Sequence, residues 1–183
     1  MGFDLATRKS PALTDEVHGM VNNELSFEDD KMEVKGVEEK KMVLFLCTHN
    51  SARSQIAEGL LRDLYGERYE AYSAGVEATA VHPRAVSVMK EVGIDISGQR
   101  SKAASELDDI VFDVAVTVCD RAKQACPICT TDIELPLRFP KAREVVHRSF
   151  EDPAAVTGSE EEELRAFRRA RDDIREWIVE AFG

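Results

Sequence analysis

The feature that most constrains this chain is a cysteine and an arginine set between a buried strand and an amphipathic helix. Residues 42–46 form a continuous apolar run, which is typical of a strand covered on both faces. Cys47, five further residues and Arg53 follow, and apolar residues then recur at helical spacing over 56–64. A strand, a short loop and a helix in this order predict an α/β unit with the loop at the helix N-terminus.

The spacing of Cys47 and Arg53 predicts an oxyanion-binding loop. Five intervening residues are enough to curl the backbone into a cup whose N–H groups point inward, where the helix dipole and a guanidinium add positive charge. That field favours the thiolate form of Cys47, a nucleophile to whose sulfur Ser54 can donate a hydrogen bond. The alternative, a buried cysteine followed by a chance arginine, does not account for the flanking strand and helix. The predicted oxyanion-binding residues are Thr48, His49, Asn50, Ser51, Ala52, Arg53 and Ser54.

Apolar strands alternate with amphipathic helices as far as the C-terminus, with further strands predicted at 69–76, 111–118 and 144–147. Pro83 opens a helix whose predicted inner face carries Val86, Met89 and Val92. Ser159 and Glu162 form a capping box at the start of the last helix. This pattern predicts an α/β fold, with a four-stranded, mostly parallel sheet and helices on both faces.

Charge separates the chain into two parts. Residues 1–40 hold ten acidic and five basic residues with few aromatic or β-branched ones, so we expect a disordered N-terminal tail before a domain at 41–183. The tail is either a solvated appendage or a regulatory or partner-docking segment. The net charge of −11 excludes a global attraction to nucleic acid or to anionic membranes, so an anion must be bound by a local device.

The cysteines point to chemistry rather than to a disulfide scaffold. The first residues carry neither a basic region nor an apolar leader, and no apolar run approaches the ~18 residues of a membrane span. Four cysteines in 183 residues are too few to staple the fold. We therefore expect a cytoplasmic protein with reduced thiols and no contact with a membrane.

Residues 47–59 resemble the phosphate-loop signature of arsenate reductases built on the low-molecular-weight protein tyrosine phosphatase fold. The resemblance continues through 73–75, 93–97, 116–119 and 150–154. It implies that Asp152, followed by Pro153, is the general acid, in the phosphatases as in the reductases. The phosphatases usually carry bulky aromatic residues next, whereas Ala154 and Ala155 follow here.

The later cysteines favour the reductases. If the strand that ends near Cys119 pairs with the first strand, the ~4.8 Å strand spacing brings Cys119 within disulfide range of Cys47. Cys126 comes seven residues later, the spacing found in thioredoxin-coupled arsenate reductases. The resemblance then implies that Cys47 attacks arsenate, Cys119 attacks Cys47 and expels arsenite, and Cys126 takes over the disulfide for thioredoxin or a similar dithiol. The alternative for Cys119 is a small core residue.

Cys126 and Cys129 also form a C-x-x-C pair, which leaves open a zinc site, a spare resolving thiol or a bystander. In the arsenate reductases a monovalent cation can sit behind the loop, and Asn50, Glu58 and Ser73 match the positions that approach it. Lys102 stands where an acidic residue is found, and its ammonium could replace such an ion. We therefore predict no metal and no cofactor.

Two other functions stay open, a phosphotyrosine phosphatase and a non-enzymatic thiol sensor or zinc-binding module. His49 stands where the family commonly has glycine, and we expect it to shape the loop or face solvent. The remaining histidines, His18, His82 and His147, have no motif around them and are predicted to be surface or packing residues.

Overall fold

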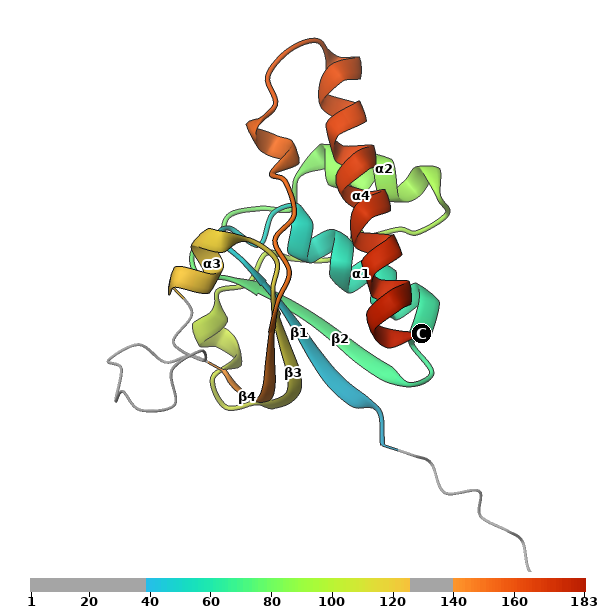
Figure 1. Cartoon of the computed structure of the whole chain (residues 1–183). Helices are drawn as coiled ribbons and strands as arrows, with labels where there is room; N and C mark the ends of the chain where they lie inside the picture. Colours follow the sequence, from blue (N-terminus) through green and yellow to red (C-terminus); the bar gives the residue numbers. More distant parts are fainter. Residues whose placement is uncertain (1–38, 126–139) are drawn as a thin grey trace, which may run out of the picture. The chain divides into compact units, whose positions relative to one another are not determined.

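The computed structural model describes residues 39–125 and 140–183, and a four-stranded parallel sheet forms its centre (Figure 1). The strands are β1 (Lys41–Cys47), β2 (Tyr69–Gly75), β3 (Val111–Thr117) and β4 (Lys141–His147). Their order across the sheet is β2-β1-β3-β4, and every pairing is parallel. The predicted α/β fold is confirmed.

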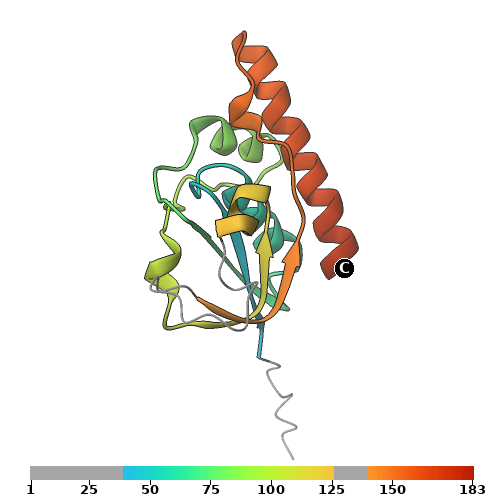
Figure 2. The same ribbon diagram turned by 60° about the vertical axis from the view of Figure 1, so that its left-hand side comes forward.

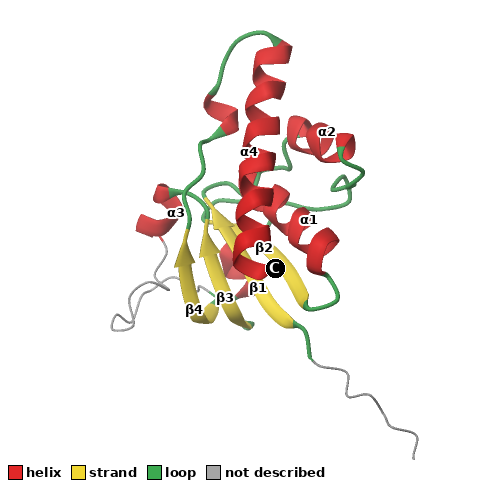
Figure 3. Ribbon diagram, turned by 45° about the vertical axis from the view of Figure 1, so that its right-hand side comes forward, coloured by secondary structure: helices red, strands yellow, loops and turns green. Residues whose placement is uncertain are grey.

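Helices cover both faces of this sheet (Figures 2 and 3). One face carries α1 (Arg53–Tyr65), α2 (Pro83–Glu91) and α4 (Glu160–Phe182), and the opposite face packs against the short helix η1 (Ala104–Leu107). Two further short helices, α3 (Asp120–Ala125) and η3 (Pro153–Ala155), follow the ends of β3 and β4 along the chain.

Strand β1 is buried on both faces, as its apolar run predicts. Val43 and Phe45 join the core beneath α1 and α4, while Leu44 and Leu46 join the core beneath η1. All four side chains are almost completely buried, and each contributes about 1.5–3 kcal/mol of hydrophobic stabilisation. This strand is the rigid support on which the loop after it is built.

Helix boundaries follow the local signals, with one exception on the α2 face. The capping box of Ser159 and Glu162 forms at the start of α4, and Pro83 opens α2. The prediction that Val92 lies on the inner face was wrong, because α2 ends at Glu91 and leaves Val92 46% exposed. The buried side of α2 is made by Ala85, Val88 and Met89.

The carboxyl ends of β1 and β3 lie side by side at the centre of the sheet. Leu46 is paired with Thr117, and the Val118 amide donates to the Leu46 carbonyl at 2.8 Å. From β1 the chain goes on through α1 to β2 at one edge of the sheet, and from β3 it goes on after α3 to β4 at the other edge. Such a divergence point between adjacent parallel strands is where open α/β sheets bind ligands.

Some predictions fall outside the described residues. The predicted tail at 1–40 lies outside them, except for Glu39 and Lys40. Cys126 and Cys129 also lie outside the described residues. In the part of the chain that is described, no helix combines the length and the apolar character needed to cross a membrane.

Candidate active site

The loop between β1 and α1 curls around the sulfur of Cys47. Asn50 has a φ of 48°, in the left-handed region that asparagine tolerates better than most residues. This turn directs the Asn50 amide back to the Cys47 sulfur, to which it donates at 3.1 Å. The Asn50 backbone amide is therefore one polar partner of this sulfur.

Neighbouring segments hold the loop in this shape. Gly75, at the end of β2, has no room for a side chain, because a Cβ there would lie 2.7 Å from the Asn50 nitrogen. On the outer side, the Ser101 hydroxyl donates to the His49 carbonyl at 3.0 Å, and the His82 amide donates to the Ser51 carbonyl at 2.9 Å. The loop is therefore pre-formed by contacts far along the sequence.

A buried chain of hydrogen bonds leads from Glu58 to the Cys47 sulfur. The Ser73 hydroxyl donates to the Glu58 carboxylate and accepts from the Asn50 side-chain amide at 2.8 Å. The same amide donates at 2.9 Å to the Ser54 hydroxyl, which lies 2.9 Å from the Cys47 sulfur. The Ser54 hydroxyl accepts from Asn50, and it can either donate to the Cys47 sulfur or accept from it. Cys47 thus has two polar partners, the Asn50 backbone amide and the Ser54 hydroxyl.

Gln55 completes the framework of the loop, and sequence reasoning missed it. Its side-chain amide donates to both the backbone and the side-chain oxygen of Asn50 and to the Arg100 carbonyl, at 2.8–3.1 Å. Gln55 is fully buried on α1. A polar residue on the inner face of an amphipathic helix was the one signal that could have identified it.

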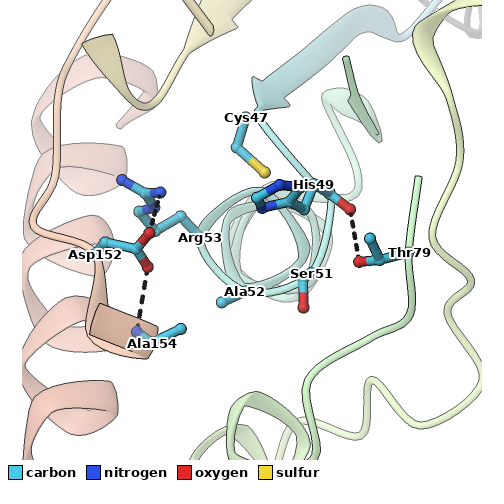
Figure 4. A pocket seen from close by; sticks show the side chains of 8 residues that line it. All are labelled: Cys47, His49, Ser51, Ala52, Arg53, Thr79, Asp152 and Ala154. Atoms are coloured by element: carbon cyan, nitrogen blue, oxygen red, sulfur yellow. Dashed lines mark hydrogen bonds and ion pairs between the residues drawn. The ribbon is translucent and has the colours of Figure 1, made fainter. Parts of the chain in front are cut away.

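Arg53 and Asp152 line a small cavity together with Cys47, and the Arg53 guanidinium is turned toward Asp152 (Figure 4). The Arg53 guanidinium donates to the Asp152 carboxylate at 2.9 Å and to the Phe150 carbonyl at 3.0 Å, and the Asp152 carboxylate also accepts from the Ala154 amide. The cavity has a volume of about 200 Å³, which suits a small ion better than a drug-sized ligand. Its lining residues are Cys47, His49, Ser51, Ala52, Arg53, Thr79, Asp152 and Ala154.

Cys119 lies close to this cavity, at the end of the strand next to β1. Leu46 is paired with Thr117, so Cys47 and Cys119 follow the paired ends of adjacent strands by one and two residues. Its sulfur contacts the Thr48 hydroxyl at 3.5 Å and accepts from the Ala122 amide at 3.3 Å. Both thiols are reduced and buried.

Comparison with known proteins agrees with this geometry. Residues 42–181 match the family described as low molecular weight phosphotyrosine protein phosphatase. The chain belongs to this family. It is 44% identical over 135 residues to the arsenate reductase of Halalkalibacterium halodurans, covering 74% of this chain and 90% of that protein. The arsenate reductase of Bacillus subtilis is also 44% identical, over 138 residues that cover 74% of this chain and 91% of that protein.

Solved structures of the family have the same fold. An arsenate reductase in the phosphate binding state superposes with a TM-score of 0.58 at 32% identity, covering 76% of this chain and 95% of that one. A low molecular weight protein tyrosine phosphatase from T. tengcongensis superposes with a TM-score of 0.60 at 26% identity, covering 78% of this chain and 98% of that one. The fold alone therefore does not separate the two activities of the family.

Lys102 occupies the place behind the loop where the resemblance to the family's reductases implies a cation. Its ammonium lies 3.4 Å from the Glu58 carboxylate, and its side chain is only 13% exposed. Arg62 contacts the other oxygen of the same carboxylate. With two cationic side chains on Glu58, these residues do not fit a resident metal ion.

We expect Lys102→Met to make the fold sensitive to potassium, because it removes one of the two cations that neutralise a buried carboxylate. The free energy of unfolding should fall by about 1–3 kcal/mol, and potassium should restore part of it. Urea unfolding in potassium chloride and in tetramethylammonium chloride at equal ionic strength measures both effects. Wild type and the exposed control Lys90→Met should give the same stability in the two salts. Unchanged stability of Lys102→Met would contradict a role for the ammonium.

Two histidines of the family fold have defined partners. His82 caps α2 by accepting from the Arg84 amide and stacks on Phe167 with ring centroids 4.6 Å apart. Burial, and next the charge of Arg84, lower the pKa of His82. The prediction of a packing role is confirmed for His82. His147 is partly exposed at the end of β4, and its ring bonds to Thr117 and Asp120.

Proposed function

We propose that this protein reduces arsenate to arsenite with Cys47 as nucleophile and Cys119 as the first resolving thiol. One observation carries the proposal: two buried, reduced thiols follow the paired ends of adjacent strands, and the sulfur of the second contacts Thr48, the residue after Cys47. Arg53 and Asp152 line cavities with each of them. A phosphatase needs one of these thiols, whereas a two-electron reduction by a disulfide relay needs both. The arsenate reductases that the chain resembles support the same assignment.

The first step builds a bond between sulfur and arsenic. Arsenate enters the cavity, where Arg53 and the loop amides, including those of Ser51 and Ala52, offset the charge on its oxygens. The Cys47 thiolate attacks arsenic, and one oxygen leaves as water after Asp152 has donated a proton to it. When arsenate binds, the Arg53 guanidinium leaves Asp152 and binds the oxyanion with both of its terminal nitrogens. Asp152, freed of its cationic partner, takes up from solvent the proton that it then donates to the leaving oxygen.

The second step transfers the electrons. The Cys119 thiolate attacks the Cys47 sulfur, and the electron pair of the sulfur–arsenic bond passes to arsenic. Arsenic is thereby reduced from As(V) to As(III) and leaves as arsenite, while the two thiols are oxidised to a Cys47–Cys119 disulfide. Each arsenate consumes one pair of thiols, so the enzyme stops after one turnover without a reductant.

The relay continues beyond the described residues. Cys126 attacks Cys119 and frees the Cys47 thiolate, and thioredoxin or a similar dithiol reduces the Cys119–Cys126 disulfide. Such recycling requires a reducing compartment, which supports a cytoplasmic location. The seven-residue spacing of Cys119 and Cys126 supports this order of exchange.

A second activity, hydrolysis of small phosphate monoesters, is favoured by the cavity itself. Cys47, Arg53 and Asp152 are arranged as a phosphoryl transfer through cysteine requires. Ala154 lines the entrance in place of an aromatic side chain, so nothing there grips a phenol ring. We therefore expect slow turnover of phenyl phosphate.

A single turnover without reductant tests the proposal. The fully reduced protein, mixed with excess arsenate, should release about one arsenite per chain and form a disulfide that includes Cys119, as measured by arsenic speciation and peptide mass spectrometry. Phosphate is the matched control, because it fills the same cavity but does not oxidise thiols. NADPH oxidation through thioredoxin and its reductase should then depend on arsenate. Free thiols after arsenate treatment would refute the reductase.

A further inference from the structure

His147 joins three elements next to Cys119. It is the last residue of β4 and is paired with Thr117 at the end of β3. Its Nδ1 lies 2.8 Å from the Thr117 hydroxyl, and its Nε2 lies 3.1 Å from the Asp120 carboxylate at the start of α3. A carboxylate can only accept, so Nε2 carries a hydrogen and donates it to Asp120. The Thr117 hydroxyl lies between Nδ1 and the Val146 carbonyl, which is 3.4 Å away.

The contact with Asp120 anchors a helix that is too short to be stable alone. Helix α3 has six residues, far below the length at which isolated helices form in water. Among the described residues, the bond from Asp120 to His147 is the one side-chain hydrogen bond or ion pair that α3 makes with another element. Ala122, which is buried, supplies its apolar contact with the core.

The first turn of α3 in turn holds the sulfur of Cys119. Cys119 directly precedes the helix, and its sulfur accepts from the Ala122 amide inside that turn. On the other side the sulfur contacts Thr48 of the oxyanion loop. If the first turn frays, the Ala122 amide moves away and the thiol loses one of its two polar contacts.

We propose that His147 is a positioning residue for Cys119. Through Asp120 it keeps the first turn of α3 closed, and the closed turn holds the Cys119 sulfur beside Cys47 for attack. The catalytic meaning of this arrangement rests on the proposed function. The effect of His147 on the reactivity of the Cys119 thiol is independent of the proposed function, because alkylation of that thiol involves no arsenate.

The direct test is the rate of alkylation of each cysteine in the reduced, full-length protein. Iodoacetamide labelling followed by peptide mass spectrometry reports Cys119 and Cys47 separately. Asp120 is 73% exposed and His147 is 24% exposed, so the bond is partly hydrated and its loss should have a moderate effect. In His147→Ala, labelling of Cys119 should rise about threefold to tenfold, the range expected for one lost hydrogen bond, while labelling of Cys47 stays unchanged.

Conservative and control variants separate positioning from general destabilisation. Asp120→Asn keeps an oxygen that accepts from Nε2 and should label like wild type, whereas Asp120→Ala should behave like His147→Ala. Combining the two alanine changes should add nothing further, because both remove the same bond. Arg143→Ala is the matched control, since it removes an exposed ion pair to Asp113 between the same two strands and should leave Cys119 unchanged.

Kinetics connect the positioning to catalysis. In single turnover, His147→Ala should release arsenite about threefold to tenfold more slowly than wild type with an unchanged KM for arsenate, because the oxyanion cavity is intact. Unchanged Cys119 labelling in His147→Ala, an equal rise at Cys47, or the same rise in Arg143→Ala would each overturn the inference. If labelling changes as expected but wild type releases no arsenite, the proposed function fails and the positioning of Cys119 stands.

Discussion

Replacing Cys47 with Ser should abolish arsenite release and phenyl phosphate hydrolysis together, each by more than about 10³-fold. Both reactions begin with the same sulfur, and a serine hydroxyl at this position is not ionised near neutral pH. The Asn50 amide and the Ser54 hydroxyl, which contact this sulfur, cannot raise a serine hydroxyl to comparable reactivity. Parallel assays of arsenic speciation and phenol release measure both losses.

The loss in Cys47→Ser must be chemical rather than structural. Serine is close in size to cysteine and retains hydrogen-bonding capacity toward Ser54, so the unfolding midpoint in urea should change little and phosphate should still bind the loop, as titration calorimetry would report. Arsenite release by the folded variant would mean that another cysteine is the nucleophile.

Replacing Cys119 with Ala should separate the two reactions. Arsenate turnover should fall by more than about 100-fold, because Cys119 is the one other cysteine among the described residues and its loss removes the thiol proposed to complete the reduction. Phenyl phosphate hydrolysis should stay within about twofold of wild type, since Cys47, Arg53 and Asp152 are untouched. The ratio of the two rates, measured on one preparation of enzyme, removes errors in active-site concentration.

The outcome of Cys119→Ala also distinguishes the remaining functional classes. A phosphatase without reductase activity would show no arsenite release in wild type and no change in the variant. A thiol sensor or zinc-binding module would need the later cysteines and would tolerate the loss of Arg53. Undiminished arsenite release by Cys119→Ala would contradict the relay, because a different residue would then resolve the arsenic adduct.

Local signals in the sequence were sufficient for most of the fold. The apolar run of β1, the proline that opens α2 and the capping box of α4 all appear in the structure where the sequence predicts them. Each is a preference that acts within one or two turns of backbone, so neighbouring residues determine it. Val92 was misplaced because the end of α2, rather than its periodicity, decides the exposure of that residue.

The sequence also predicted that the cysteine and the arginine of the loop act together. Five residues between a strand and a helix have few conformations that bring a cysteine and an arginine at the two ends of the loop to one anion. Placing Cys119 near the loop required one further assumption, that its strand pairs with β1. The structure confirms this pairing, because Leu46 of β1 is paired with Thr117 of β3.

The partners of the loop were decided by tertiary structure. The chain of hydrogen bonds behind Cys47 joins residues from α1 and β2. The hydrogen bond between His147 and Asp120 joins residues that are 27 positions apart in the sequence. No local periodicity marks a buried Gln55 or a histidine at a strand end as part of a site. The sequence by itself determined which candidate residues the chain offers for the chemistry. Because parallel strands bring distant carboxyl ends to one edge of the sheet, the folding of the sheet decided which of these residues meet.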